Sequence, residues 1–179
     1  MNKKSFNYDI LLKITKAMSM SKDPEKVVVQ TVKSIKEAMD IKGCALFLID
    51  PKNRKLEVAA SLGLSEEYLN KGPLSPFGTI EDGPVAIYDV TDDPRIQYPK
   101  EAKKEGIASI LSVPIVFKGD VIGSIRVYTS EPWDFTLEDV NFVQALAQIA
   151  GIMIEMCRLY KGQNEYIDVL TTMRETLPL

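Results

Sequence analysis

Residues 106–128, with the sequence GIASILSVPIVFKGDVIGSIRVY, decide the fold of this chain. Two apolar runs, Ile107–Phe117 and Val121–Tyr128, flank the turn residues Lys118-Gly119-Asp120. Short apolar runs bounded by Gly and Asp are typical of β-strands, so this stretch predicts a β-hairpin.

A second hairpin is predicted closer to the N-terminus. Ala45–Ile49 is a buried-strand run, residues 50–53 have turn chemistry, and Leu56–Leu62 returns as the partner strand. Val85–Val90 adds a further strand. The segment between them, residues 63–84, is punctuated by Gly and Pro, with one helical turn near residues 65–69.

Helices are predicted at both ends of the chain. Asp23-Pro24 indicates an N-cap and first turn for a helix that ends near Asp40, and an amphipathic helix precedes it. A short helix is expected from Pro99 to Glu105. Thr136 and Asp139 form a capping-box pattern that opens a long helix to about residue 161, with a break at Gly162 and a further helix beyond it.

This order of elements predicts an α+β fold. We expect a central antiparallel sheet of five to six strands, with the N- and C-terminal helices packed on one face and the loops and short helices on the other. The predicted divisions are an N-terminal helix (1–22), a folded domain (23–160) and a C-terminal helical extension (161–179).

Composition restricts the function. The 179 residues carry a net charge of −3 and contain no histidine, which excludes His-based triads, zinc sites and haem ligands. Cys44 and Cys157 stand alone, so we expect a reduced, cytoplasmic protein without a metal site or a cofactor. Neither nucleic acid nor a membrane is an expected partner, because the chain is not basic and the longest apolar run, Ile107–Phe117, is too short to span a bilayer.

Four stretches together resemble the GAF domain family of ligand-sensing modules, over about residues 24–160. They are Gly43–Asp50 (GCALFLID), Tyr88–Arg95 (YDVTDDPR), Gly106–Ile115 (GIASILSVPI) and Val121–Tyr128 (VIGSIRVY). The resemblance implies a GAF-type sheet and a regulatory role in signal transduction, with a small molecule as ligand. A shared fold does not by itself carry a shared ligand.

Several GAF subtypes are excluded by particular residues. This chain matches the signature of the cyclic-nucleotide-binding subtype at Phe135 and Asp139. It departs from that signature where Val140 stands in place of Glu, and where Tyr128-Thr129 stand in place of Asn-Lys. Bilin attachment and haem ligation through His are excluded because no His is present. Free methionine sulfoxide reductases of this fold place cysteines around the pocket, and neither Cys44 nor Cys157 lies there in the sequence. We therefore predict no catalytic residues; a small cysteine-based redox enzyme is the third-ranked alternative.

The candidate ligand site is centred on Arg126, which shares a strand face with Ser124 and Tyr128 because side chains alternate along a strand. Its cation would hold a carboxylate or phosphate of a small polar ligand. The full set of candidate binding residues is Arg126, Tyr128, Ser124, Ser109, Ser112, Tyr88 and Phe47.

Each of these interpretations has an alternative. Arg126 would instead pair with an acid such as Asp89. The segment 63–84 is either a lid over the site or an ordinary connection. Asp92-Asp93-Pro94-Arg95 invites a metal-site interpretation, but capping of a helical turn is favoured.

The long C-terminal helix carries two apolar stripes. The first is the candidate dimer seam, and its residues are Phe142, Leu146, Ile149, Met153, Met156 and Tyr160. The second consists of Val143, Ala147, Ala150, Ile154 and Cys157. A helix that is apolar on two sides must be buried on both, so we expect a homodimer, unless the N-terminal helices (residues 5–40) cover both stripes.

The sequence therefore predicts a non-catalytic sensor domain that binds a small molecule and signals through the terminal helices of a homodimer to an effector domain or signalling protein. A ligand-free GAF module that only dimerises or binds partners is the alternative.

Overall fold

The computed structural model describes the backbone of residues 8–21, 23–72, 74 and 83–176, and the side chains from Leu11 to Gln163 within those ranges, Met18 excepted. Five strands form one antiparallel sheet: β1 (Gly43–Ile49), β2 (Leu56–Leu62), β3 (Val85–Ile87), β4 (Ser109–Phe117) and β5 (Asp120–Thr129). Their order is β2-β1-β5-β4-β3, so the two predicted hairpins lie side by side through the β1–β5 pair. The predicted α+β fold is confirmed.

The β4–β5 hairpin turns where the sequence indicated. Lys118 and Gly119 both adopt positive φ, 52° and 91°, as a tight two-residue turn requires. Further along β5, Gly123 lies against β1, and a Cβ there would meet the backbone oxygen of Phe47 at 2.2 Å. Glycine at position 123 thus allows the two central strands to approach each other.

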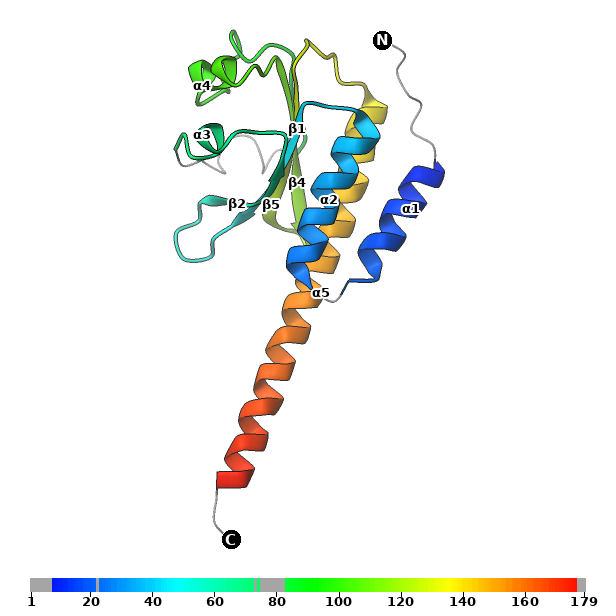
Figure 1. Ribbon diagram of the computed structural model, residues 1–179, viewed down its shortest axis with the longest axis vertical. Helices are drawn as coiled ribbons and strands as arrows, with labels where there is room; N and C mark the ends of the chain where they lie inside the picture. Colours follow the sequence, from blue (N-terminus) through cyan, green and yellow to red (C-terminus); the bar gives the residue numbers. More distant parts are fainter. Residues whose placement is uncertain (1–7, 22, 73, 75–82, 177–179) are drawn as a thin grey trace.

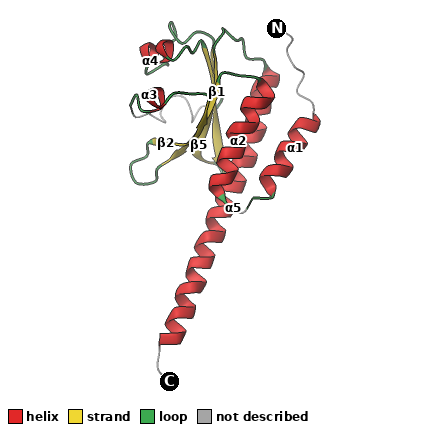
Figure 2. Ribbon diagram, viewed as in Figure 1, coloured by secondary structure: helices red, strands yellow, loops and turns green. Residues whose placement is uncertain are grey.

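Three helices cover one face of the sheet: α1 (Tyr8–Ser19), α2 (Pro24–Met39) and α5 (Leu137–Thr176). Figures 1 and 2 show α2 and α5 against this face with α1 outside them, whereas α3 (Glu66–Leu69) and α4 (Pro99–Lys104) lie on the other side. The predicted placement of the helices is therefore confirmed.

The helix caps match the sequence signals. The Asp23 side chain accepts a hydrogen bond from the backbone N–H of Glu25, and Pro24 opens α2. At α5, the Asp139 carboxylate accepts from the backbone N–H of Thr136 at 2.7 Å, and the Thr136 hydroxyl accepts from the N–H of Asp139 at 3.2 Å. This is the reciprocal pairing of a capping box.

The predicted break at Gly162 is wrong, because α5 continues without interruption to Thr176. A single glycine inside a helix costs only about 1 kcal/mol relative to alanine, and the neighbouring residues are good helix formers. The third strand is also shorter than predicted: β3 ends at Ile87 rather than at Val90.

The sheet separates two hydrophobic cores. The larger core lies between the sheet and the helices α1, α2 and α5, and includes Leu46, Ile125 and Leu146. The smaller core lies on the opposite face under α3 and α4, and includes Phe47, Tyr68 and Tyr128. The two faces therefore have separate environments, and only the second one contains the candidate ligand site.

Helix α5 extends well beyond the sheet, and its C-terminal half stands clear of the other elements in Figure 1. By length and composition alone, its segment Leu137–Gln163 would suffice to cross a membrane, because its most apolar 18-residue window has a mean hydropathy of 1.4. In this structure 44 % of that segment's most apolar window is buried inside the protein, where it covers the sheet. Part of its apolar character is thus accounted for by the core.

Candidate functional site

Alternation along β4 and β5 sets which side chains face the smaller core. Ser112 pairs with Arg126 across the two strands, and Ile110 pairs with Tyr128. All four side chains leave the sheet on the face opposite α5, because residues two apart on a strand share a face. The predicted common face of Ser124, Arg126 and Tyr128 follows from the same alternation.

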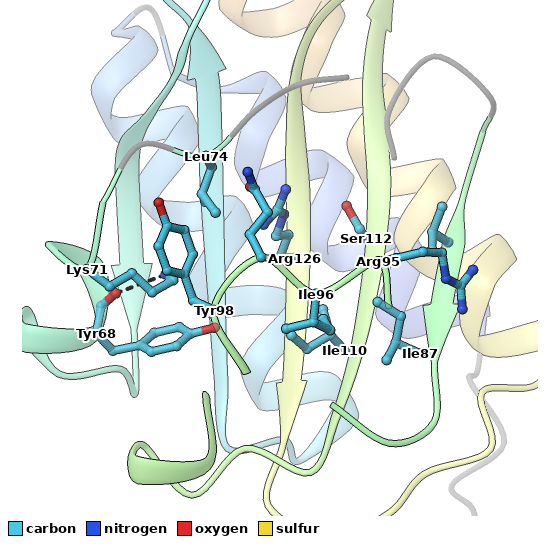
Figure 3. Close-up of a pocket in the computed structure, with 12 residues that line it drawn as sticks. Tyr68, Lys71, Leu74, Ile87, Arg95, Ile96, Tyr98, Ile110, Ser112 and Arg126 are labelled. Carbon is cyan, nitrogen blue, oxygen red and sulfur yellow. Dashed lines mark hydrogen bonds between the residues drawn. The ribbon is translucent and has the colours of Figure 1, made fainter. Parts of the chain in front are cut away.

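A cavity of about 260 Å³ lies over this face. Its floor is formed by Ile110, Ser112 and Arg126 from the sheet, and edge strand β3 adds Val85 and Ile87. Figure 3 shows the covering side chains on the segments around α3 and before α4. These covering residues are Tyr68, Lys71, Leu74, Arg95, Ile96, Gln97 and Tyr98.

Arg126 is the central polar group of the cavity. Its guanidinium carbon lies 5.3 Å from the centroid of the Phe47 ring, so the cation lies over the face of that ring. Its Nε is buried and has no hydrogen-bond partner among the described residues, and the same is true of the hydroxyls of Ser112 and Ser124. A buried donor without a partner is costly, and this site has three such polar side chains together.

Lys71 brings a second cation to the cavity. Its Nζ donates to the backbone oxygen of Tyr68 at 2.9 Å and lies 3.6 Å above the centre of the Tyr68 ring. The pKa of Lys71 is lowered to about 8, first by burial and then by the positive charge of Arg126. Glu101 and Glu105 on the α4 side act in the opposite direction but do not offset these effects.

The third cation, Arg95, is already paired. Its Nε donates to Asp93 at 2.8 Å, and one terminal nitrogen donates to the other carboxylate oxygen of Asp93 and to the backbone oxygen of Ala86. Asp93 also accepts the backbone N–H of Arg95 at 2.9 Å, which is the turn-capping role that the sequence favoured over a metal site.

Two tyrosines pack against each other beside the cavity, and one of them, Tyr68, lines it. The rings of Tyr68 and Tyr128 meet edge to face, with centroids 5.8 Å apart. Burial raises the pKa of Tyr128 to about 12 and raises that of Tyr68 as well. Both phenols are protonated at neutral pH, and the phenol oxygen of Tyr128 is hydrogen-bonded to the guanidinium of Arg126.

Two predicted binding residues, Ser109 and Tyr88, lie away from the site altogether. Ser109 is three residues from Ser112 and therefore faces the other side of the sheet, where its hydroxyl donates to the backbone oxygen of Tyr88 and accepts from the N–H of Trp133. The side chain of Tyr88 is 59 % exposed. Asp89, the acid considered as a partner for Arg126, is instead hydrogen-bonded to Thr91.

Phe47, Ser124 and Tyr128 are buried around the site, although they do not line the cavity itself. Tyr68, Lys71 and Tyr98 line the cavity but were not among the predicted binding residues. Tyr68 lies on the single helical turn α3, and Lys71 and Tyr98 lie in irregular segments, so no periodicity indicates where their side chains point. Part of the proposed lid, residues 73 and 75–82, lies outside the described residues.

The predicted dimer seam divides into a buried and an exposed part. Phe142 and Leu146 are buried in the core of the domain and are not available to another subunit. The second stripe, Val143 to Cys157, is likewise buried against the sheet and the N-terminal helices. Ile149 and Met153 pack at the edge of that core, whereas Met156 and Tyr160 are 44 % and 59 % exposed.

Both cysteines are buried. Burial raises the pKa of the Cys44 thiol and of the Cys157 thiol, so neither is activated toward nucleophilic attack. Cys44 faces the helix side of the sheet and Cys157 lies on α5, so neither lines the cavity.

The comparisons with known proteins agree with this fold. The sequence profile of the GAF domain family matches residues 21–155, and the chain belongs to that family. A search of curated protein sequences returned no match.

Solved structures show the same architecture. A GAF domain of a phosphoenolpyruvate-protein phosphotransferase from Coxiella burnetii superposes with a TM-score of 0.77 at 22 % identity, covering 90 % of this chain and 99 % of that one. The GAF domain of the Acinetobacter phosphoenolpyruvate-protein phosphotransferase superposes with a TM-score of 0.74 at 23 % identity, covering 85 % of this chain and 94 % of that one. Free methionine-R-sulfoxide reductase from Neisseria meningitidis, solved with its substrate, gives 0.71 at 20 % identity, over 86 % and 90 %.

Proposed function

We propose that this GAF domain is a non-catalytic sensor that binds a small organic anion in the cavity above β4 and β5. The observation that carries the proposal is the group of unpartnered polar atoms on the floor: the Nε of Arg126 and the hydroxyl of Ser112, paired across the two strands. A carboxylate or phosphate oxygen placed between them would accept from both.

The charge and size of the cavity support an anion of metabolite size. Arg126 and Lys71 both line it, while no Asp or Glu does so among the residues that the structure describes. Its volume of about 260 Å³ falls just below the range of roughly 300–1,000 Å³ usual for small-molecule sites. The remaining walls are mostly aliphatic or aromatic, as is usual for such sites.

The route from the cavity to α5 passes through the sheet. Arg126 on β5 has Ile125 and Val127 as neighbours, and these two side chains belong to the core that α5 covers. A ligand that binds one of two conformations better would shift the population toward it, and α5 is the element placed to report that shift.

Dimerisation through the projecting part of α5 completes the proposal. Ile152, Met156 and Leu159 are 48 %, 44 % and 60 % exposed, and they are separated by four and then three residues. Along the sequence the same alternation continues through Gln163, Tyr166, Leu170 and Met173. This spacing is the heptad pattern of a two-helix seam, so we place the seam on Ile152, Met156 and Leu159 rather than on Phe142 and Leu146.

The ligand proposal is tested by mass spectrometry of the native protein, purified in parallel as wild type, Arg126→Met and Arg95→Met. We expect a retained small molecule in the wild type and in Arg95→Met, and its loss in Arg126→Met, because Arg95 is already paired with Asp93. Equal retention by Arg126→Met would place the ligand elsewhere and refute the assignment.

The dimer proposal is tested by light scattering of Leu159→Glu beside the control Lys161→Glu, since both side chains are exposed on α5. We expect Leu159→Glu to be monomeric and the control to remain dimeric. A monomeric wild type, or dissociation of both variants, would contradict the proposed seam.

A further inference from the structure

The cavity contains two cations that enter it from different elements. Arg126 rises from β5 on the floor, and Lys71 reaches in from the segment after α3, beside Tyr98 (Figure 3). Arg95 is neutralised by Asp93. Arg126 has no ion-pair partner among the described residues. Like charges in a partly desolvated site repel each other, and the repulsion weakens when a counter-charge enters.

The groups around Lys71 leave room for such a counter-charge. Its ammonium contacts the backbone oxygen and the ring of Tyr68, and lies 5.8 Å from the centre of the Tyr98 ring. Glu105 is held outside the cavity, where its carboxylate accepts from the N–H and hydroxyl of Ser65 at 2.8 and 2.5 Å. Glu101 is an exposed residue of α4 that does not line the cavity. Among the described residues, the contacts of Lys71 inside the cavity are therefore with neutral groups.

The walls around these cations are apolar. Leu74, Ile87, Ile96 and Ile110 contribute hydrocarbon surface to the same cavity. A complementary ligand therefore has charge at its ends and a short hydrocarbon chain between them.

We infer that the ligand is a short-chain dicarboxylate, with one carboxylate bound by Arg126 and Ser112 and the other by Lys71. The inference rests on the proposed function, because it assigns a second anionic group to the ligand of that same site. A monocarboxylate would compensate only one of the two cations. A phosphate monoester would concentrate both negative charges at one end and would leave the other cation unpaired.

The test is isothermal titration of the wild-type protein with linear dicarboxylates of three to six carbons, each beside the monocarboxylate of equal length. Butyrate is the partner of succinate in this series. We expect at least one dicarboxylate to bind more tightly than its monocarboxylate, by roughly 10- to 100-fold, as a hydrogen bond between charged groups provides.

Lys71→Met isolates the second contact, and Lys100→Met is its matched control, since Lys100 is an exposed residue of α4 that does not line the cavity. We expect Lys71→Met to lose the preference for dicarboxylates while binding monocarboxylates as before. Lys100→Met should behave like the wild type. If the lysine acts only through the net charge of the protein, both variants will bind dicarboxylates equally weakly. That result would overturn the inference.

A measurement on the wild type alone provides an independent readout should the variant fail to fold. The pKa of Lys71 is lowered to about 8, so at pH 8.5 most of its amine is neutral. A second carboxylate beside Lys71 would raise this pKa, and the Lys71 amine would then take up a proton. The uptake would approach roughly three quarters of a proton per ligand bound. Titrations in Tris and in triethanolamine, two amine buffers whose ionisation enthalpies differ and which supply no competing oxyanion, report this uptake. Uptake should be clearly larger with the dicarboxylate than with the monocarboxylate, which compensates only Arg126 and so relieves only part of the shift. Equal uptake with both ligands would contradict the second contact.

The outcomes separate the inference from the proposed function. If mono- and dicarboxylates bind equally well and both depend on Arg126, the sensor proposal stands and the second contact is wrong. If no member of the series binds at 10 mM, the dicarboxylate inference is overturned, and the retained-ligand experiment decides the proposed function separately.

Discussion

Replacing Arg126 with methionine is expected to stabilise the ligand-free protein while removing its ligand. Arg126 is half-buried, its Nε has no partner among the described residues, and its charge lowers the pKa of Lys71. Leaving a buried polar group unpaired costs about 1–3 kcal/mol. Methionine keeps an unbranched, apolar side chain over Phe47 and has no donor to satisfy.

The expected net gain is smaller than that cost. The contact between the guanidinium and the Phe47 ring is lost, and it is worth about 0.5–1 kcal/mol at a partly exposed site. The hydrogen bond between Arg126 and Tyr128 is lost as well. We therefore expect the free energy of unfolding to rise by less than about 1 kcal/mol, because removing the unpaired donor slightly outweighs the lost contacts. For a domain of this size that corresponds to a rise in Tm of less than about 4 °C.

Urea unfolding followed by circular dichroism measures this change, with Arg95→Met as the matched control. Arg95 lines the same cavity but donates to both oxygens of Asp93. Its loss should destabilise the protein by about 0.5–1 kcal/mol, as for a well-oriented surface pair. The two arginines thus have opposite expected signs. An Arg126→Met protein destabilised as much as Arg95→Met would refute the argument that Arg126 is uncompensated.

Three further predictions concern other residues. The pKa of Lys71 is about 8 in the folded state, below its ordinary value of 10.5. Between these two pH values the unfolded chain binds more protons than the folded one, so the free energy of unfolding rises as pH rises from 8 to 10.5. Subtracting the urea-unfolding profile of Lys71→Met from that of the wild type isolates this contribution, and parallel profiles would contradict it. Thr136→Ala should destabilise the protein by about 1 kcal/mol in the same assay through loss of the α5 cap, and no change would mean that water replaces the hydroxyl. Cys44 and Cys157 should react with a thiol reagent only in denaturant, since both are buried; rapid labelling of the native protein would reopen the redox-enzyme alternative.

Most of the architecture was predictable because its signals are local. The hairpin turn at Lys118-Gly119, the cap at Asp23 and the capping box at Thr136 each depend on a few neighbouring residues, and each is present in the structure. The helix break predicted at Gly162 is wrong because a helix tolerates one glycine when the neighbouring residues favour helix.

The candidate site was predictable only where the sheet defines it. Strand alternation places Arg126 and Ser112 on the cavity face, and applied strictly it would have excluded Ser109, which is an odd number of residues from Ser112. Lys71 and Tyr98 come from segments that follow no period, and only the folded chain brings them over the sheet. Phe142 and Leu146 were assigned to the predicted seam but are buried in the core, because the helical period alone does not distinguish a stripe that faces the core from one that faces another subunit.

The pairing of β1 with β5 also affects how the chain reaches its fold during synthesis. Gly43 pairs with Tyr128, so the centre of the sheet joins residues that are far apart in sequence. The β1–β2 hairpin is made early, but β5 begins only 58 residues and α5 only 75 residues after the end of β2. At usual rates of elongation this is a delay of about 3–15 s. During that interval the apolar face of β1, including Cys44 and Leu46, has only α2 to cover it. This early hairpin is therefore the segment of the nascent chain most exposed to aggregation and to binding by chaperones.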